Sequence, residues 1–175
     1  PDSFDKLNEK LIKYEEITDR IEFEIASYLN EVSKGHLSDE SKARIKSLYK
    51  IIGEMESLGD SGEAIGRILK RRNAHGKVFD KTILDRLNRM CDLVQKGYDV
   101  MIENLRNKES RDISAAHNCE YNINECRNHL REEHIVNIES DSYNYLTGVY
   151  YMDVLAELEK IGDFLINISQ AVSGK

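Results

Sequence analysis

Apolar residues recur every three or four positions over five long stretches of the chain, and this spacing predicts five α-helices. The stretches run over about 4–32, 38–72, 79–106, 113–135 and 142–172. The clearest apolar stripe belongs to the third stretch and consists of Ile83, Leu87, Met90, Val94, Met101 and Leu105. Polar turns such as KGHLSDE separate the stretches, and Ser38 in this turn is a suitable N-cap. Long helices with short connections favour an all-α fold, an antiparallel helix bundle.

Composition agrees with a helical fold and narrows the range of functions. The 175 residues include one proline, Pro1, and no tryptophan, and 33% of them are charged. The net charge of −7 argues against the basic surface that a nucleic-acid partner would require. There is no run of 18 apolar residues, and the three cysteines form no C-x-x-C pair. We therefore expect a cytosolic protein whose cysteines are reduced core residues, with Cys119 and Cys126 on one helix face.

A repeat divides the chain into two parts. One pattern, E-x-E-x-[LI]-G-D, occurs in GEMESLGD at 53–60 and returns 103 residues later in AELEKIGD at 156–163. The preceding helices also correspond, since EEITD at 15–19 matches EYNIN 105 residues later. The third stretch has no counterpart before residue 1. The sequence thus predicts one domain of two repeats over 1–175, in which 1–76 lacks its leading helix and 77–175 has all three helices.

Acidic residues of the first repeat are spaced to meet across a helix hairpin. Residues four apart on a helix share a face and lie about 6 Å apart along its axis. Glu15 and Asp19 form one such pair, and Glu56 and Asp60 form another. If the first two helices fold back on each other near residue 37, Glu15 lies level with Asp60 and Asp19 lies level with Glu56. The stripes continue to Glu22 and Glu63, so that six carboxylates could converge.

The second hairpin repeats this arrangement with fewer acids. A turn near residue 141 brings Glu120 level with Asp163 and Asn124 level with Glu159. Arg127 occupies the position that corresponds to Glu22. We expect its guanidinium to pair with Glu159 or Asp163 in place of a cation, and the first site to bind metal better. The glycines that precede Asp60 and Asp163, Gly59 and Gly162, are expected to let a neighbouring backbone approach closely.

Carboxylates that converge repel one another unless a cation neutralises them. Hard oxygen ligands suit Mg²⁺, Ca²⁺, Mn²⁺ or oxidised iron, and we expect a divalent or trivalent cation from the set Mg, Ca, Mn, Fe and Zn. The candidate ligands are Glu15, Asp19, Glu22, Glu56, Asp60, Glu63, Glu120, Glu159 and Asp163. The alternative interpretation is a solvated acidic face on a helical scaffold without metal.

No catalytic motif is recognisable in the sequence. It contains neither a P-loop nor a G-x-S-x-G sequence. Di-iron bundles need Glu-x-x-His motifs, and no histidine follows a glutamate at that spacing. We expect the protein not to be an enzyme. The histidines are expected at the surface or at helix ends, and they are His36, His75, His117, His129 and His134.

At these motifs the sequence resembles the PhoU family of phosphate-uptake regulators, which is built from two three-helix repeats marked by E/D-x-x-x-D motifs. The resemblance is strongest at LAELEKIGDFLINIS, residues 155–169, and weaker at IIGEMESLGDSGEAIG, residues 51–66. YEEITDRIEFEI and CEYNINECRNHLREEHI are similar to the helices that face these motifs. The second repeat is particularly similar to the PhoU-like tail of sodium/phosphate cotransporters.

The resemblance implies a cytoplasmic regulatory domain that binds metal cations and is held at the membrane through a phosphate transporter domain of the same polypeptide. The alternative is a stand-alone PhoU-like phosphate regulator. The absent leading helix would leave an apolar stripe exposed on the first hairpin, near Leu11, Ile25, Ile51 and Leu58. Exposed stripes of this kind bind partners, and we expect a homodimer or a swapped helix.

Overall fold

The computed structural model describes residues 2–107, 112–138 and 144–174, without the side chains of 2–8, 10, 11, 14, 15, 137 and 138. Within these ranges the chain forms five long helices. They are α1 (Asp2–Ser33), α2 (Asp39–Ala74), α3 (Lys81–Arg106), α4 (Ser114–Ile138) and α5 (Tyr145–Ser173). The predicted all-α fold is confirmed, and each helix boundary lies within three residues of the expected position.

Capping side chains explain where the helices begin. The Ser38 hydroxyl accepts a hydrogen bond from the backbone N–H of Ser41 at 3.2 Å, as an N-cap should. Asp80 caps α3 in the same way, so that this helix begins two residues later than predicted and Phe79 lies outside it. Phe79 is instead buried in the core, with the Arg72 guanidinium 4.5 Å from the centroid of its ring. Asn144 caps α5, whereas Ser142, where this helix was expected to begin, lies outside the described residues.

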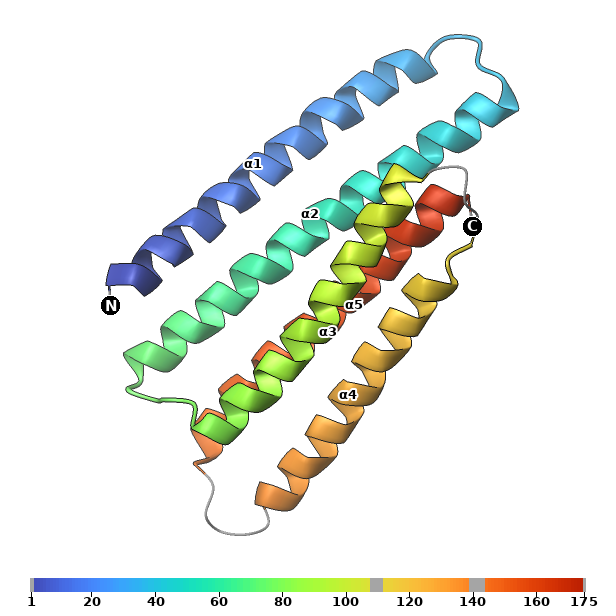
Figure 1. The fold of residues 1–175 in the computed structure, drawn as a ribbon. Coiled ribbons are helices and arrows are strands. Elements are labelled where there is room, and N and C mark those ends of the chain that lie inside the picture. Colours follow the sequence, from blue (N-terminus) through green and yellow to red (C-terminus); the bar gives the residue numbers. More distant parts are fainter. Residues whose placement is uncertain (1, 108–111, 139–143, 175) are drawn as a thin grey trace.

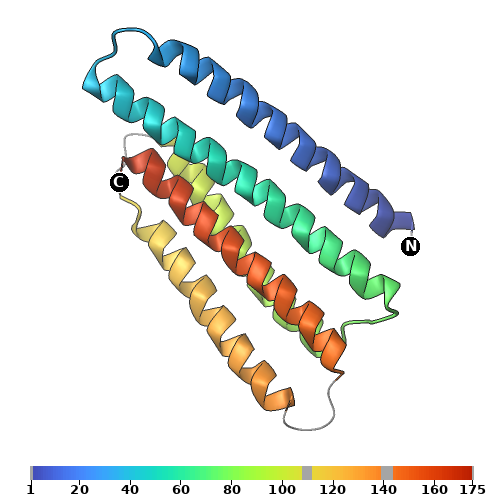
Figure 2. The same ribbon diagram turned by 180° about the vertical axis from the view of Figure 1, so that it is seen from behind.

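Two antiparallel helices, α2 and α5, form the centre of the bundle (Figures 1 and 2). The α1 helix lies beside α2, and α4 lies beside α5. The α3 helix lies against α4 and α5, in front of α5 in Figure 1 and behind it in Figure 2. Among the described residues α1 packs against α2 alone, and no described helix occupies on the first hairpin the place that α3 has on the second.

The hydrophobic core is concentrated in the second repeat. Met90 of α3, Ile123 of α4 and Tyr151 of α5 are at most 1% exposed and belong to one buried cluster. A second cluster consists of Met101, Leu165 and Ile168, and Ile51 and Leu58 of α2 pack against it. The first hairpin is therefore attached to the core through α2. None of the described helices combines the length and hydrophobicity needed to cross a bilayer.

Two expectations about single residues are wrong. Cys91 is exposed and not part of the core, whereas Cys126 is buried and Cys119 is half-buried. His134 is 5% exposed, far from a surface position, because it packs edge-on against the ring of Tyr151. Burial, together with the positive charge of Arg86, lowers the pKa of His134.

Candidate metal centre

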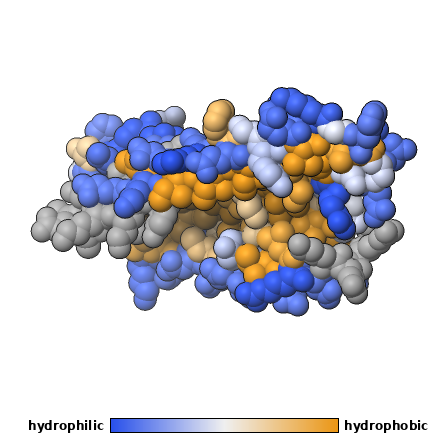
Figure 3. Space-filling view, turned by 90° about the horizontal axis from the view of Figure 1, so that it is seen from above, coloured by the Kyte–Doolittle hydropathy of each residue, from blue (hydrophilic) through white to orange (hydrophobic). Residues whose placement is uncertain are grey.

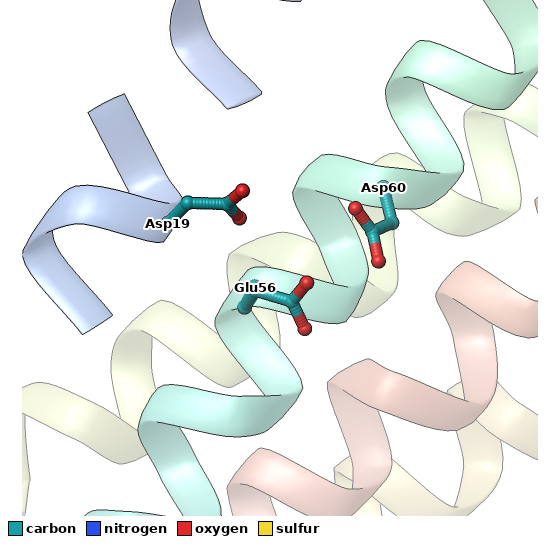
Figure 4. A group of neighbouring side chains, drawn as sticks. All are labelled: Asp19, Glu56 and Asp60. Atoms are coloured by element: carbon teal, nitrogen blue, oxygen red, sulfur yellow. The ribbon is translucent and has the colours of Figure 1, made fainter. Parts of the chain in front are cut away.

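Three carboxylates of the α1–α2 hairpin converge on the face shown in Figure 4. Asp19 projects from α1 toward Glu56 and Asp60 of α2, and each residue offers an oxygen within 4.8 Å of the others. Asp19 and Asp60 are exposed and Glu56 is half-buried. The predicted register is thus correct, because the turn at 34–38 sets Asp19 beside Glu56. We call Asp19, Glu56 and Asp60 the acidic triad.

The acidic triad is electrostatically unfavourable without a cation. The pKa of Glu56 is raised to about 7, first by burial and then by a hydrogen bond with Asp60 and by the negative charges of Asp60, Asp19 and Glu22. Near neutral pH this side chain therefore holds its proton about half of the time. The three carboxylates of the acidic triad offer the oxygen ligands that Mg²⁺, Ca²⁺ and Mn²⁺ prefer. A bound cation could displace the proton of Glu56.

Of the six acids predicted for the first site, the described side chains bring three within 4.8 Å of one another. Glu63 turns away to pair with Arg67, one helical turn further along, with 2.7 Å between Oε2 and Nη1. Glu22 raises the pKa of Glu56 by its charge but does not belong to the acidic triad. Glu15 lies on α1, and its side chain is outside the described part of the chain.

The second hairpin compensates its acids with a guanidinium, as the sequence predicted. The Nη2 atom of Arg127 lies 2.6 Å from Oε1 of Glu159, and the amide of Asn124 donates to Glu120 at 2.9 Å. The pKa of Asp163 is raised by burial and then by Glu159 and Glu120, while the charge of Arg127 opposes the shift. Among the described residues no second group of acids meets the spacing of the acidic triad. The structure therefore makes the two hairpins unequal.

A third acidic residue of the repeat signature, Glu54, has a role that the sequence analysis missed. Its carboxylate accepts a hydrogen bond at 3.1 Å from Asn167, which joins α2 to α5. Its charge also raises the pKa of Asp163. The signal was present, since Glu54 and its counterpart Glu157 both belong to the repeated pattern. Glu157 itself pairs with Lys160 at 2.8 Å.

The two signature glycines have different surroundings. A Cβ atom at Gly162 would lie 3.0 Å from the side chain of Ile123. The expected close approach is therefore found at Gly162, but the neighbour is a side chain and not a backbone. A Cβ atom at Gly59 would meet Thr18 at 3.7 Å, an ordinary contact, and the expectation is wrong at this position. At the signature glycine, the α4–α5 hairpin is thus packed more tightly than the α1–α2 hairpin.

Alanine substitution at Gly162 and at Gly62 should change the free energy of unfolding in opposite directions, because the space around the two residues differs. Gly162→Ala is expected to lower the free energy of unfolding by about 1–3 kcal/mol, because Ile123 is β-branched and buried and cannot move freely. Gly62→Ala is the matched control, since nothing lies within 4 Å of the new Cβ, and it should stabilise the helix by up to about 1 kcal/mol. Urea unfolding measures both, and a Gly162→Ala protein as stable as the parent would contradict the packing account.

Stability without metal should fall as the pH rises from about 4.5 to about 7. The folded protein holds the Glu56 proton up to about pH 7, whereas an unfolded glutamate releases it near 4.5. Protonation thus favours the folded state fully below pH 4.5, and this stabilisation is lost above pH 7. One pKa unit corresponds to about 1.4 kcal/mol, and solvent screening should leave about 1–2 kcal/mol in total.

Urea unfolding at pH 5 and at pH 7.5, in the presence of a chelator, measures this difference. Glu56→Gln removes the titrating group and should reduce the loss of stability between the two pH values. An equal loss in the parent and the Glu56→Gln protein would show that other groups are responsible.

The fold and the site define an all-α protein of two related helix hairpins, one of which presents an acidic triad. Residues 87–172 match the family model of the PhoU domain. The fold resembles the crystal structure of PhoU from Pseudomonas aeruginosa with a TM-score of 0.82. The similarity covers 95% of this chain and 79% of that chain at 17% identity, so it concerns the fold alone. No protein with a curated description matches the chain.

The match confirms the resemblance that residues 155–169 indicate, since this segment lies inside the matched range. Residues 51–66, where the resemblance is weaker, lie outside that range. The structural similarity nevertheless extends over both hairpins, because it covers nearly the whole chain.

Proposed function

We propose that this chain is a PhoU-like regulatory domain of phosphate uptake, made of two repeats, which binds a metal cation at the acidic triad. The observation that supports the proposal best is the convergence of Asp19, Glu56 and Asp60 in a fold of the PhoU type. PhoU domains regulate transport and do not catalyse a reaction, and we infer the same role here. The protein would act by changing its contacts with a partner.

The position of the acidic triad suggests how cation binding could alter those contacts. Asp19 belongs to α1, which packs against α2 alone among the described helices. A cation held by Asp19, Glu56 and Asp60 would connect α1 to α2 directly and remove the repulsion between the two helices. Loss of the cation would weaken this connection, so that cation occupancy determines how firmly α1 is attached.

Phosphate uptake in cells is the measurement that tests this function. Cells that produce the Asp19→Asn/Asp60→Asn protein are expected to lose the dependence of phosphate uptake on external phosphate that the parent protein confers. Glu16→Gln, which removes an exposed carboxylate of α1 outside the acidic triad, is the matched control and should behave as the parent. If both variants regulate uptake as the parent does, while deletion of the protein abolishes regulation, the metal-dependent function is wrong.

The finer form of the proposal is that the domain is the cytoplasmic tail of a sodium/phosphate cotransporter and has the transporter domain in the same polypeptide as its partner. The motivation for this form is the sequence resemblance of the second repeat to such tails. The coding sequence before Pro1 tests it, since several apolar spans of about 20 residues are expected there. A separate reading frame that begins near Pro1 would favour the stand-alone regulator.

A further inference from the structure

A groove of about 650 Å³ lies between residues 64–71 of α2 and residues 153–160 of α5, at the end of the bundle where α2 ends and α5 begins (Figure 1). Six of its nine lining residues are charged, and they are Arg67, Lys70, Arg71, Asp153, Glu157 and Lys160. By contrast, the hollow that Figure 3 shows is bordered by polar rims but lined mainly by hydrophobic residues. The groove therefore suits a charged ligand. We call it the basic groove.

The lining of the basic groove is positive, although the protein as a whole is acidic. Four cationic side chains and two carboxylates leave an excess of two positive charges, in a chain whose net charge is −7. Arg67, Lys70 and Arg71 share one face of α2, because residues three and four positions apart on a helix are neighbours. Lys160 adds a cation from α5. An anion in the groove is thus attracted from both helices.

The cations of the basic groove have donors to spare. Arg67 pairs with Glu63 at 2.7 Å and Lys160 pairs with Glu157 at 2.8 Å, but these two cationic side chains are 60% and 54% exposed. Exposed pairs of this kind are weak, and a guanidinium or an ammonium has several N–H groups. Among the described residues no carboxylate lies within 4.0 Å of Lys70 or Arg71. The groove can therefore donate hydrogen bonds to an added anion.

The fold itself does not require these positive charges. By the repeat offset of 103 residues, Arg67, Lys70 and Arg71 correspond to Gln170, Ser173 and Gly174, which are all uncharged. The negative end of the α2 dipole attracts cations only within the last helical turn, and Arg67 lies about two turns before Ala74, where α2 ends. Lys160 lies in the middle of α5. Neither helix packing nor dipole compensation accounts for the whole cluster, whereas a bound anion does.

We propose that the basic groove binds an oxyanion of the phosphate type that carries several negative charges, held between Lys70 and Arg71 of α2 and Lys160 of α5. A guanidinium donates two parallel hydrogen bonds to such an anion, and ammonium groups add point charges. The volume falls in the range of roughly 300–1,000 Å³ that is usual for ligand sites, which leaves room for more than one phosphate group. No member of the acidic triad lines the groove, so the proposal does not depend on metal binding.

Isothermal titration calorimetry with pyrophosphate, in metal-free buffer at neutral pH and physiological ionic strength, tests the proposal. The absence of metal excludes binding through a cation at the acidic triad. The parent protein should bind one pyrophosphate per chain, and Lys70→Gln and Arg71→Gln should each weaken binding at least about tenfold by removing a charged donor. Asp153→Asn should strengthen binding, because it removes a carboxylate from the lining.

Arg44→Gln is the matched control, since it removes the same charge from an exposed residue of α2 outside the basic groove, and it should bind as the parent does. Inorganic phosphate should bind more weakly than pyrophosphate, because it carries fewer charges. A parent protein that binds no pyrophosphate would overturn the proposal, even if it bound vesicles of anionic lipid. Equal weakening in Arg44→Gln and Arg71→Gln would also overturn it, because the effect would then be one of overall charge.

Discussion

A saturating concentration of Mg²⁺, Ca²⁺ or Mn²⁺ should raise the melting temperature of this protein by about 5 °C or more at pH 7. A ligand present at a hundred times its dissociation constant stabilises the folded state by about 2.7 kcal/mol, and for a chain of this size about 1 kcal/mol shifts the melting temperature by 2–4 °C. The acidic triad provides this binding energy, since a cation both accepts three oxygen ligands and removes the repulsion that, after burial and the hydrogen bond with Asp60, raises the pKa of Glu56.

Substitutions in the acidic triad should change the melting temperature in opposite directions with and without metal. Asp60→Asn is expected to abolish most of the metal-dependent increase, because it removes one ligand oxygen and one charge. The same substitution should raise the melting temperature in a chelator, because Asp60 increases the repulsion at Glu56. A variant that lost only general folding stability would melt lower in both conditions.

Two controls make this result specific. Glu16→Gln changes the net charge equally but leaves the acidic triad intact, and it should keep the full response to metal. Asp163→Asn should keep most of it, because the acids of the second hairpin are compensated by Arg127. Equal loss of metal response in Asp60→Asn and Asp163→Asn would refute the proposed inequality of the two hairpins. Identical melting curves of the parent with and without metal would favour the scaffold without metal.

Arg127→Met should lower the free energy of unfolding by about 2–3 kcal/mol at pH 7. The substitution keeps an apolar side chain of similar length but leaves the half-buried Glu159 without its partner, and also exposes Asp163 to uncompensated negative charge. Removing one member of a fully buried pair costs about 3–5 kcal/mol, and the partial exposure of this pair reduces the loss. The loss should shrink as the pH falls, because the raised pKa of Asp163 lets its carboxylate take up a proton more readily.

Arg86→Met provides the matched control for charge removal. Arg86 pairs with Glu133 at 2.9 Å and is similarly exposed, but the pair joins α3 to α4 away from the acids of the second hairpin. We expect a loss of about 1 kcal/mol or less, because a single carboxylate can turn into water. Equal losses in both variants would show that Arg127 contributes an ordinary ion pair and does not act in place of a cation.

A double substitution that replaces Arg127 by an acid tests whether the second hairpin then needs a cation. Asn124→Asp/Arg127→Glu gives the second hairpin the acids that the first has at the corresponding positions, Asp19 and Glu22. This variant should be less stable than the parent in a chelator and should recover more stability than the parent when Mn²⁺ is added. If metal does not restore it, the register of the helices alone does not create a cation site.

The sequence predicted which residues lie level across each hairpin, because helices are regular. A constant rise of 1.5 Å per residue means that the position of the turn fixes which residues lie level across a hairpin. This is why Asp19 meets Glu56, and why Arg127 meets Glu159, as expected. Helix boundaries were also predictable, since Ser38 stabilises the first turn of α2 by contacts within a few residues.

Side-chain partners were less predictable, because a flexible side chain selects among several neighbours. Glu63 lies on the acidic stripe but pairs with Arg67 instead. Ile51 and Leu58 belong to the apolar pattern of the first hairpin, and they were expected in the exposed stripe. They pack against α5 instead. The packing of α2 beside α5 determines which side of α2 is covered, and these two residues lie on that side.

By itself, the sequence of this protein determined five helices, two hairpins in register and the acids that each hairpin brings to one level, because these follow from contacts between near neighbours and from helix geometry. The tertiary structure decided that α2 and α5 form the centre, that Glu56 is buried enough to hold a proton near pH 7, and that the face around Ile21 and Leu48 is left uncovered. Burial and the resulting pKa shifts depend on all the surrounding helices together, and no local pattern in the chain specifies them.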